Sequence, residues 1–259
     1  MTGGGYRGPQ MQMNMSIPVT PVVKWLIIIN LAVWVVFQLI VERLLLGQPI
    51  VTLLFGLVPF SVLQKFFVWQ TFSYMFLHSY SVFHIVFNLL LLWMMGSELE
   101  QRWGSRFFLI YYLVCGWGAG VIYSLTIGII GLVTGSFPGW TTPVIGASGA
   151  IFGLMLAYGI IFGERIVYFF MIFPMKAKVF VLLLGAIEFV TLLSSGIGGS
   201  DVANLAHLGG IISGFLFLKV YTHRQQNRWR KRSGERGRGL RLVVNNDRKK
   251  EKDGPKYWN

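Results

Sequence analysis

The sequence predicts an all-α membrane protein, a bundle of six transmembrane helices, and three observations indicate this fold class. Of the 259 residues, 54% are apolar and only 13% are charged, which is about half of the charged fraction of a soluble domain. Long stretches hold no charged residue at all, namely 25–41, 66–97 and 107–163. Such runs are longer than a buried core helix and lack the alternation of an outer-membrane barrel. An ordinary soluble enzyme is therefore excluded.

The first part of the chain is expected to form a leader, one span and an interfacial segment. Residues 1–21 are rich in Gly, Met, Gln and Pro and have no periodic apolar face, so we expect a flexible leader. Residues 22–41 form the first span, because the run is too long for a signal peptide and Glu42 and Arg43 follow it instead of a cleavage site. Residues 43–81 mix Gly, Pro and aromatic residues, which favours a segment lying in the headgroup layer.

Five more spans follow, and the breaks between them are marked by Pro and Gly, which interrupt helices. Pro138 and Pro143 divide the longest uncharged run, and Pro174 interrupts a second interfacial loop at 166–178. These spans complete a single domain at 22–221. Their expected bounds are 82–99, 106–127, 147–163, 177–195 and 202–221.

The basic residues predict the orientation of the chain. The second and fourth loops and the C-terminus carry Lys and Arg, whereas the third and fifth loops carry none. Because basic loops stay on the cytoplasmic side, both termini are expected in the cytoplasm. From Lys219 onward, fourteen bases against four acids supply +10 of the net charge of +13. We expect the tail at 222–259 to face membrane lipid and not nucleic acid.

Three of the spans then run inward from the outer face, and polar residues stand at their N-terminal ends. The second span begins with His84 and Asn88, which are four apart and share one helix face. The fourth begins with Ser148, and the sixth with Asn204 and His207. Polar groups inside a span are costly, so three sets at a common depth indicate a wet functional site.

The short fourth span makes its serine a candidate nucleophile. Its seventeen residues are about 25 Å long against a hydrocarbon core of about 30 Å, so Ser148 is expected to start below the outer surface. A helix N-terminus also offers unpaired backbone N–H groups and the positive end of the helix dipole, which stabilise an oxyanion. Serine, histidine and oxyanion donors together are the minimum set for acyl transfer.

Three motifs stand in order on the second, fourth and sixth spans. They are His84-x-x-x-Asn88, Gly146-x-Ser148-Gly149 and Ala206-His207-x-x-Gly210-x-x-x-Gly214, with supporting matches at Gly96-x-x-x-Glu100-x-x-x-Gly104 and Pro174-x-Lys176-Ala177-Lys178. Over residues 22–221, this ordered set resembles the rhomboid family of intramembrane serine proteases. Each motif alone is common, and the order together with the span numbers carries the resemblance.

The resemblance implies roles for individual residues. Ser148 would be the nucleophile and His207 its general base, in a dyad without an orienting carboxylate. His84 and Asn88, with the backbone N–H of Ser148, would form the oxyanion hole. Gly146 would let the backbone approach the scissile carbonyl.

Further residues would support this site by packing. In a well-known bacterial relative, a tyrosine four residues after the serine stacks on the catalytic histidine. Phe152 stands at that position here, so the ring is kept and the hydroxyl group is absent. Gly149 belongs to the run of small residues around the serine. Gly210 and Gly214, four apart, would let the sixth span press against the fourth.

The expected function is therefore that of a serine endopeptidase that acts on transmembrane segments of other proteins without a cofactor. The expected location is a plasma membrane, namely a bacterial inner membrane. The lone Cys115 can form neither an internal disulfide nor a metal site with a second thiol. Membrane lipids are the other expected partners.

Two other functions remain open at this stage. One is a non-catalytic rhomboid-like protein that binds transmembrane clients, although this chain keeps both the serine and the histidine. The other is a small transporter with a proton relay through Glu188 and His207, which the lack of an internal repeat disfavours. Glu188 is otherwise expected to pack against a neighbouring helix or to act in gating, and His78 and His223 are expected to be solvated bystanders.

Overall fold

The computed structural model describes residues 18–169, 173–195 and 202–237. The chain divides into two compact units, residues 1–218 and 219–259. The leader expected at 1–21 falls largely on residues outside the described ranges, as does most of the expected tail. In the second unit, the described residues continue the last helix of the chain and are exposed up to Arg230.

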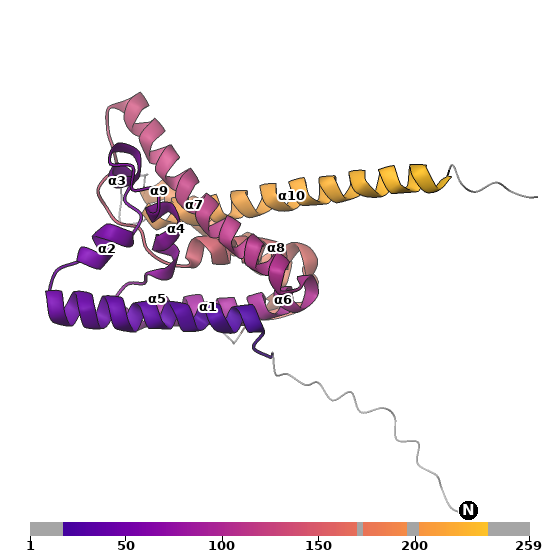
Figure 1. Ribbon diagram of the computed structural model, residues 1–259, viewed down its shortest axis with the longest axis horizontal. Helices are drawn as coiled ribbons and strands as arrows, with labels where there is room; N and C mark the ends of the chain where they lie inside the picture. The colour runs from indigo at the N-terminus through magenta and orange to yellow at the C-terminus, as the bar shows by residue number, and fades with distance from the viewer. Residues whose placement is uncertain (1–17, 170–172, 196–201, 238–259) are drawn as a thin grey trace, which may run out of the picture. The chain divides into compact units, whose positions relative to one another are not determined.

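Six helical rods account for most of the residues that the structure describes, and some of them are made of consecutive segments that follow without a break (Figure 1). The first two rods contain π-helical segments, η1 and η3. In chain order, the rods are α1 (Pro21–Ala32) with η1 (Val33–Leu46), α5 (Val82–Leu91) with η3 (Leu92–Gly96) and α6 (Ser97–Trp103), α7 (Ser105–Thr134), α8 (Ser148–Ile161), α9 (Ala177–Ser195) and α10 (Val202–Gly237).

The predicted class of an all-α, multi-pass membrane protein is confirmed. Among the described residues, five rods are long and apolar enough to cross a membrane, and α8 is a shorter apolar helix of 14 residues. Four rods are longer than expected, among them the second, which reaches Trp103, and α10, which reaches Gly237. The first extends to Leu46 and α7 to Thr134, and each ends at a glycine of positive φ, Gly47 at +61° and Gly135 at +71°. Such a left-handed residue closes a helix at little steric cost.

The two segments expected at the membrane interface contain regular structure of their own. Residues 43–81 include three short α-helices and a 3₁₀ turn, namely α2 (Ile50–Phe55), α3 (Pro59–Gln64), α4 (Gln70–Ser73) and η2 (Tyr74–Phe76). Where a loop was expected at 166–178, β1 (Ile166–Phe169) and β2 (Phe173–Lys176) form an antiparallel hairpin with Pro174 opposite Tyr168. Both strands are edges, where a proline is tolerated.

Helix α8 lies at the centre of the bundle because glycines allow neighbouring backbones to approach it. A Cβ on Gly210 of α10 would lie 1.9 Å from the carbonyl oxygen of Gly149, and a Cβ on Gly153 would lie 2.4 Å from Cys115 Sγ of α7. No larger residue fits at either position. Gly214 differs from the expectation, because a Cβ there would meet Tyr111 Oη of α7 at 2.5 Å instead of α8.

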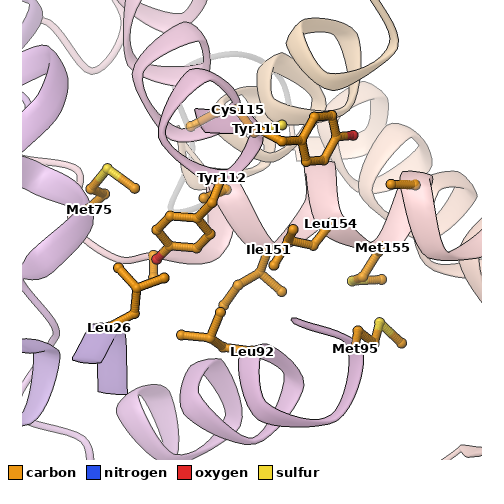
Figure 2. Close-up of a cluster of buried hydrophobic side chains, with 14 of the residues drawn as sticks. Leu26, Met75, Leu92, Met95, Tyr111, Tyr112, Cys115, Ile151, Leu154 and Met155 are labelled. Carbon is orange, nitrogen blue, oxygen red and sulfur yellow. The ribbon is translucent and has the colours of Figure 1, made fainter. Parts of the chain in front are cut away.

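Larger apolar side chains fill the opposite face of α8. Figure 2 shows Ile151, Leu154 and Met155 of α8 among residues of the neighbouring helices, and all three are almost completely buried. Leu92 and Met95 of η3 belong to the same buried cluster. Since lipid is as apolar as these side chains, close packing rather than transfer from water holds the helices together here.

A buried carboxylate fixes the start of α1. Glu100 of α6 is 3% exposed and accepts hydrogen bonds from the N–H groups of Val22 and Val23, both at 3.0 Å. It also accepts from the hydroxyls of Thr20, at 2.5 Å, and Ser105, at 2.6 Å. The carboxylate therefore caps the N-terminus of α1, where unpaired N–H groups and the helix dipole favour negative charge.

We predict that Glu100→Gln lowers the free energy of unfolding by about 3 kcal/mol, because four hydrogen bonds lose their charged acceptor and an amide N–H₂ faces backbone donors. Thermal unfolding of the detergent-solubilised protein measures the change. Glu98→Gln in the same helix is the matched control, since its ion-pair partner Arg165 is half-exposed and the variant should lose less than about 1 kcal/mol. Equal effects of the two variants would contradict the capping role.

Candidate active site

Ser148 and His207 meet although they are far apart in the sequence. Ser148 is the first residue of α8, and His207 lies in the second turn of α10. The hydroxyl oxygen Oγ of Ser148 lies 2.7 Å from His207 Nε2, which is hydrogen-bonding distance. Both residues are partly buried. The pair is close enough for the imidazole to take the proton of the hydroxyl group.

The ring of His207 is held by Phe152 on one face. Phe152 lies one turn after Ser148 on α8, and the two rings stack with their centroids 4.5 Å apart and their planes 13° apart. The contact joins the two rings, so it requires no hydroxyl group on residue 152. Stacking fixes the plane of the imidazole.

A carboxylate also reaches this ring. Glu188 Oε2, from the middle of α9, lies 3.0 Å from His207 Nδ1, and the two side chains are 17% and 15% exposed. The N–H does not point at the carboxylate, so neither atom has a hydrogen-bond partner among the described residues. The resemblance implied a dyad with no carboxylate at this place. The sequence held a signal, since an acid inside an apolar span usually has a partner.

His84 lies beside the serine with a defined tautomer. The backbone N–H of Ser79 donates to His84 Nδ1 at 3.2 Å, so the proton of a neutral ring is on Nε2. A Cβ on Gly146 would lie 3.0 Å from His84 Nε2 and 3.5 Å from Ser148 Oγ. Gly146, at φ +130°, therefore lies between the N–H of His84 and the hydroxyl of Ser148. Any side chain at position 146 would fill the space between His84 Nε2 and Ser148 Oγ.

Asn88 and Asn204 are the buried amides of this region. Asn88 is 6% exposed, and its Nδ2 donates to the carbonyl oxygen of His84 at 2.7 Å. Since the amide has two N–H bonds, one donor is left for a further acceptor. Asn204 lies one turn before His207, and its amide nitrogen has no partner among the described residues.

Residues of the first rod hold the segment that orients His84, and their role was not predicted from the sequence. Trp34 Nε1 donates to the carbonyl oxygen of Ser79 at 2.9 Å. Gln38 exchanges two hydrogen bonds with the backbone of His78, at 2.5 and 2.7 Å, and is 1% exposed. A buried amide inside the first apolar run was the available signal, because such a group needs a partner.

The expectation that His78 is a solvated bystander is wrong. Its side chain is completely buried, and its ring lies 5.3 Å from the His84 ring. Burial, with a smaller contribution from His84, lowers the pKa of His78 to about 3. His78 is thus neutral at physiological pH and adds no charge beside His84. His223, in contrast, is exposed on α10, as expected.

The chemistry of the site is that of a hydroxyl next to a base, with N–H donors close by. Among the described residues, no group of three or more His, Cys, Asp or Glu side chains is arranged to hold a metal ion. Cys115 is a buried thiol inside α7. A serine with a base and donors for a developing oxyanion is suited to acyl transfer.

Comparison with known proteins agrees with the motifs. A family model for the Rhomboid domain matches residues 65–224. The RHOMBOID-like protein 1 of Arabidopsis thaliana is 34% identical over 195 residues, which are 73% of this chain and 44% of that protein. The Rhomboid protease GlpG of Yersinia pseudotuberculosis is 28% identical over 162 residues, 61% of this chain and 50% of that protein. The chain thus spans about half the length of the curated relatives it matches. Since the domain match covers more than half of its residues, this chain belongs to the rhomboid family.

Proposed function

We propose that this protein is an intramembrane serine endopeptidase that hydrolyses peptide bonds within or next to transmembrane segments of other proteins. The observation that carries the proposal is the 2.7 Å contact of Ser148 Oγ with His207 Nε2 inside a bundle of membrane-spanning helices. The names of the GlpG relatives, which are called rhomboid proteases, support the same activity.

In the first step, Ser148 Oγ attacks the scissile carbonyl carbon while His207 Nε2 takes the hydroxyl proton. The imidazolium then gives this proton to the leaving amine, and the acyl group stays on the serine. A water molecule attacks the acyl-enzyme next, with His207 again as the base. The acid product leaves, and Ser148 regains its hydroxyl group.

The negative oxygen of the tetrahedral intermediate would be stabilised by three donors. Ser148 opens α8, so its backbone N–H is one of the unpaired donors of a helix N-terminus. The Nε2–H of His84 and the second N–H of the Asn88 amide are the others. Donors fixed before the reaction need little rearrangement when charge develops, which makes them effective in a site of low polarity.

Helix α8 is short, and this bears on how substrate and water reach the serine. Its 14 residues are about 21 Å long, less than the hydrocarbon core of about 30 Å. Ser148 would then lie below the membrane surface in a cavity open to water from one side. A substrate helix shields its own peptide bonds, so it must unwind locally before attack. Small residues at the cut and helix-weakening residues after it would favour this step.

The charged groups support an orientation with the site towards the outer face. Past the far end of α8, Arg165 pairs with Glu98, and Glu164 pairs with Lys176 at 2.8 Å and with Lys178. These lysines hold the pKa of Glu164 at about 2. Basic residues gather on the cytoplasmic side of a membrane. We therefore propose that both termini lie in the cytoplasm. We also propose that the membrane is the plasma membrane of a bacterium.

We predict that Ser148→Ala reduces cleavage by more than about 10³-fold, because the nucleophile is lost while no volume is added. Cleavage of a single-span substrate reconstituted with the protein in liposomes measures this, and the unfolding temperature should stay unchanged. Ser213→Ala is the matched control, because Ser213 is a buried serine of α10 whose hydroxyl group donates to the carbonyl oxygen of Gly209 in the same helix. Cleavage by Ser148→Ala at the wild-type rate would show that Ser148 is not the nucleophile, whereas a wild-type protein that does not cleave would favour the client-binding alternative.

We predict that Asn88→Ala lowers kcat by about 10²-fold, the usual effect of removing one oxyanion donor. Asn30→Ala controls for the structural part of the change, since Asn30 of α1 also bonds through Nδ2 to a carbonyl one turn earlier, at 2.7 Å. That variant should keep the wild-type kcat. If Asn88→Ala behaves in the same way, the oxyanion hole consists of His84 and the backbone N–H alone.

A further inference from the structure

One carboxylate touches the catalytic base but takes no part in the steps above. Glu188 Oε2 lies 3.0 Å from His207 Nδ1, while Nε2 of the same ring lies 2.7 Å from Ser148 Oγ. A single imidazole is thus placed between a hydroxyl group and a carboxylate. In serine hydrolases with this order of groups, the acid fixes the tautomer and the direction of the base.

The surroundings of Glu188 make His207 its essential partner. Both side chains are largely buried, and α9 is one of the helices long and apolar enough to cross a membrane. A carboxylate in such a place is costly unless it is paired. Among the side chains that the structure describes, the ion pairs assign no other partner to Glu188. The contact therefore accounts for an acidic residue in the middle of an apolar helix.

The other contacts of the ring leave a role for this carboxylate. Phe152 stacks on the flat face of His207 and so fixes the plane of the imidazole. It cannot decide which nitrogen faces Ser148, because a stacked ring can turn over without losing the contact. Nε2 must be free of a proton to accept one from Ser148, so Nδ1 must carry the proton of the neutral ring. A carboxylate next to Nδ1 favours that arrangement over the reverse.

We propose that Glu188 is a positioning residue that accepts the Nδ1–H of His207 and keeps Nε2 directed at Ser148, so that the site operates as a Ser148–His207–Glu188 triad. This inference rests on the proposed endopeptidase function. It requires the side chain of Glu188 to turn slightly, since the N–H and the carboxylate are close but not aligned. Catalytic hydrogen bonds are often loose before substrate binds and tighten in the complex.

The transfer of protons balances without a change in the charge of Glu188. As the bond between Ser148 Oγ and the carbonyl carbon forms, the hydroxyl proton moves to His207 Nε2 and makes an imidazolium ion. Glu188 remains a carboxylate throughout and stabilises this cation at Nδ1. When the C–N bond breaks, Nε2 returns the proton to the amine. Glu188 exchanges no proton with the substrate and acts through His207.

The test compares Glu188→Gln, Glu188→Asp and the control Thr191→Val in liposomes with a single-span substrate. Thr191 lies one turn further along α9, and its hydroxyl group donates to the carbonyl oxygen of Ile187 in the same helix. For Glu188→Gln, we expect kcat to fall on the order of 10²-fold with KM unchanged, less than the roughly 10⁴-fold effect of replacing an orienting aspartate in a well-aligned triad. Glu188→Asp should regain part of the loss, and Thr191→Val should match the wild type.

A second readout separates positioning from a packing role. The rate of labelling by a small fluorophosphonate, which needs an activated serine but no transmembrane substrate, should fall in parallel with kcat in Glu188→Gln at an unchanged unfolding temperature. A wild-type labelling rate in that variant, or a loss explained by a lower unfolding temperature, overturns the inference and leaves the endopeptidase proposal intact. If the wild-type protein neither cleaves nor labels, the endopeptidase proposal itself fails, and the triad with it.

Discussion

The distance between Ser148 and His207 depends on one backbone contact between two helices. Gly149 follows the serine directly, and Gly210 lies one turn after the histidine, so the place where the two glycines meet sets the separation of the two side chains. A Cβ on Gly210 would lie only 1.9 Å from the carbonyl oxygen of Gly149. Any residue with a side chain would push the helices apart by more than a hydrogen bond tolerates. The small residues around the site are thus a geometric condition for the contact of Ser148 with His207.

Polar side chains on the first rod perform a related task at the edge of the site. In the absence of water, each buried polar group needs a partner, and here the partners are loop segments that would otherwise be free to move. Glu42 accepts hydrogen bonds from the hydroxyl groups of Thr52, at 2.8 Å, and Tyr80, at 2.5 Å. With Gln38 on the backbone of His78, it fixes the segment whose N–H sets the tautomer of His84. The first rod therefore orients a candidate oxyanion donor without touching it.

The sequence predicted the spans well, because uncharged runs and helix-breaking residues are local properties of the chain. It also indicated the ordered motifs on the second, fourth and sixth spans, since short spacings such as four residues translate directly into a shared helix face. The apolar surroundings of Glu188 signalled that it needs a partner, but its contact with His207 at Nδ1 depends on how α9 is rotated relative to α10. The cap that Glu100 places on α1 joins residues 77 to 80 positions apart, and the burial of His78 depends on packing beneath the first rod. Local patterns do not report either arrangement.

In the proposed mechanism Ser148 is an activated nucleophile, and a chemical probe tests this most directly. Fluorophosphonate labelling of the detergent-solubilised protein, followed by peptide mass mapping, locates any covalent adduct, with a known active rhomboid protease labelled in parallel. We expect one adduct, on Ser148, that is absent when His207 is replaced by Ala. An adduct on another residue, or no adduct on this protein while the known protease is labelled, would contradict it.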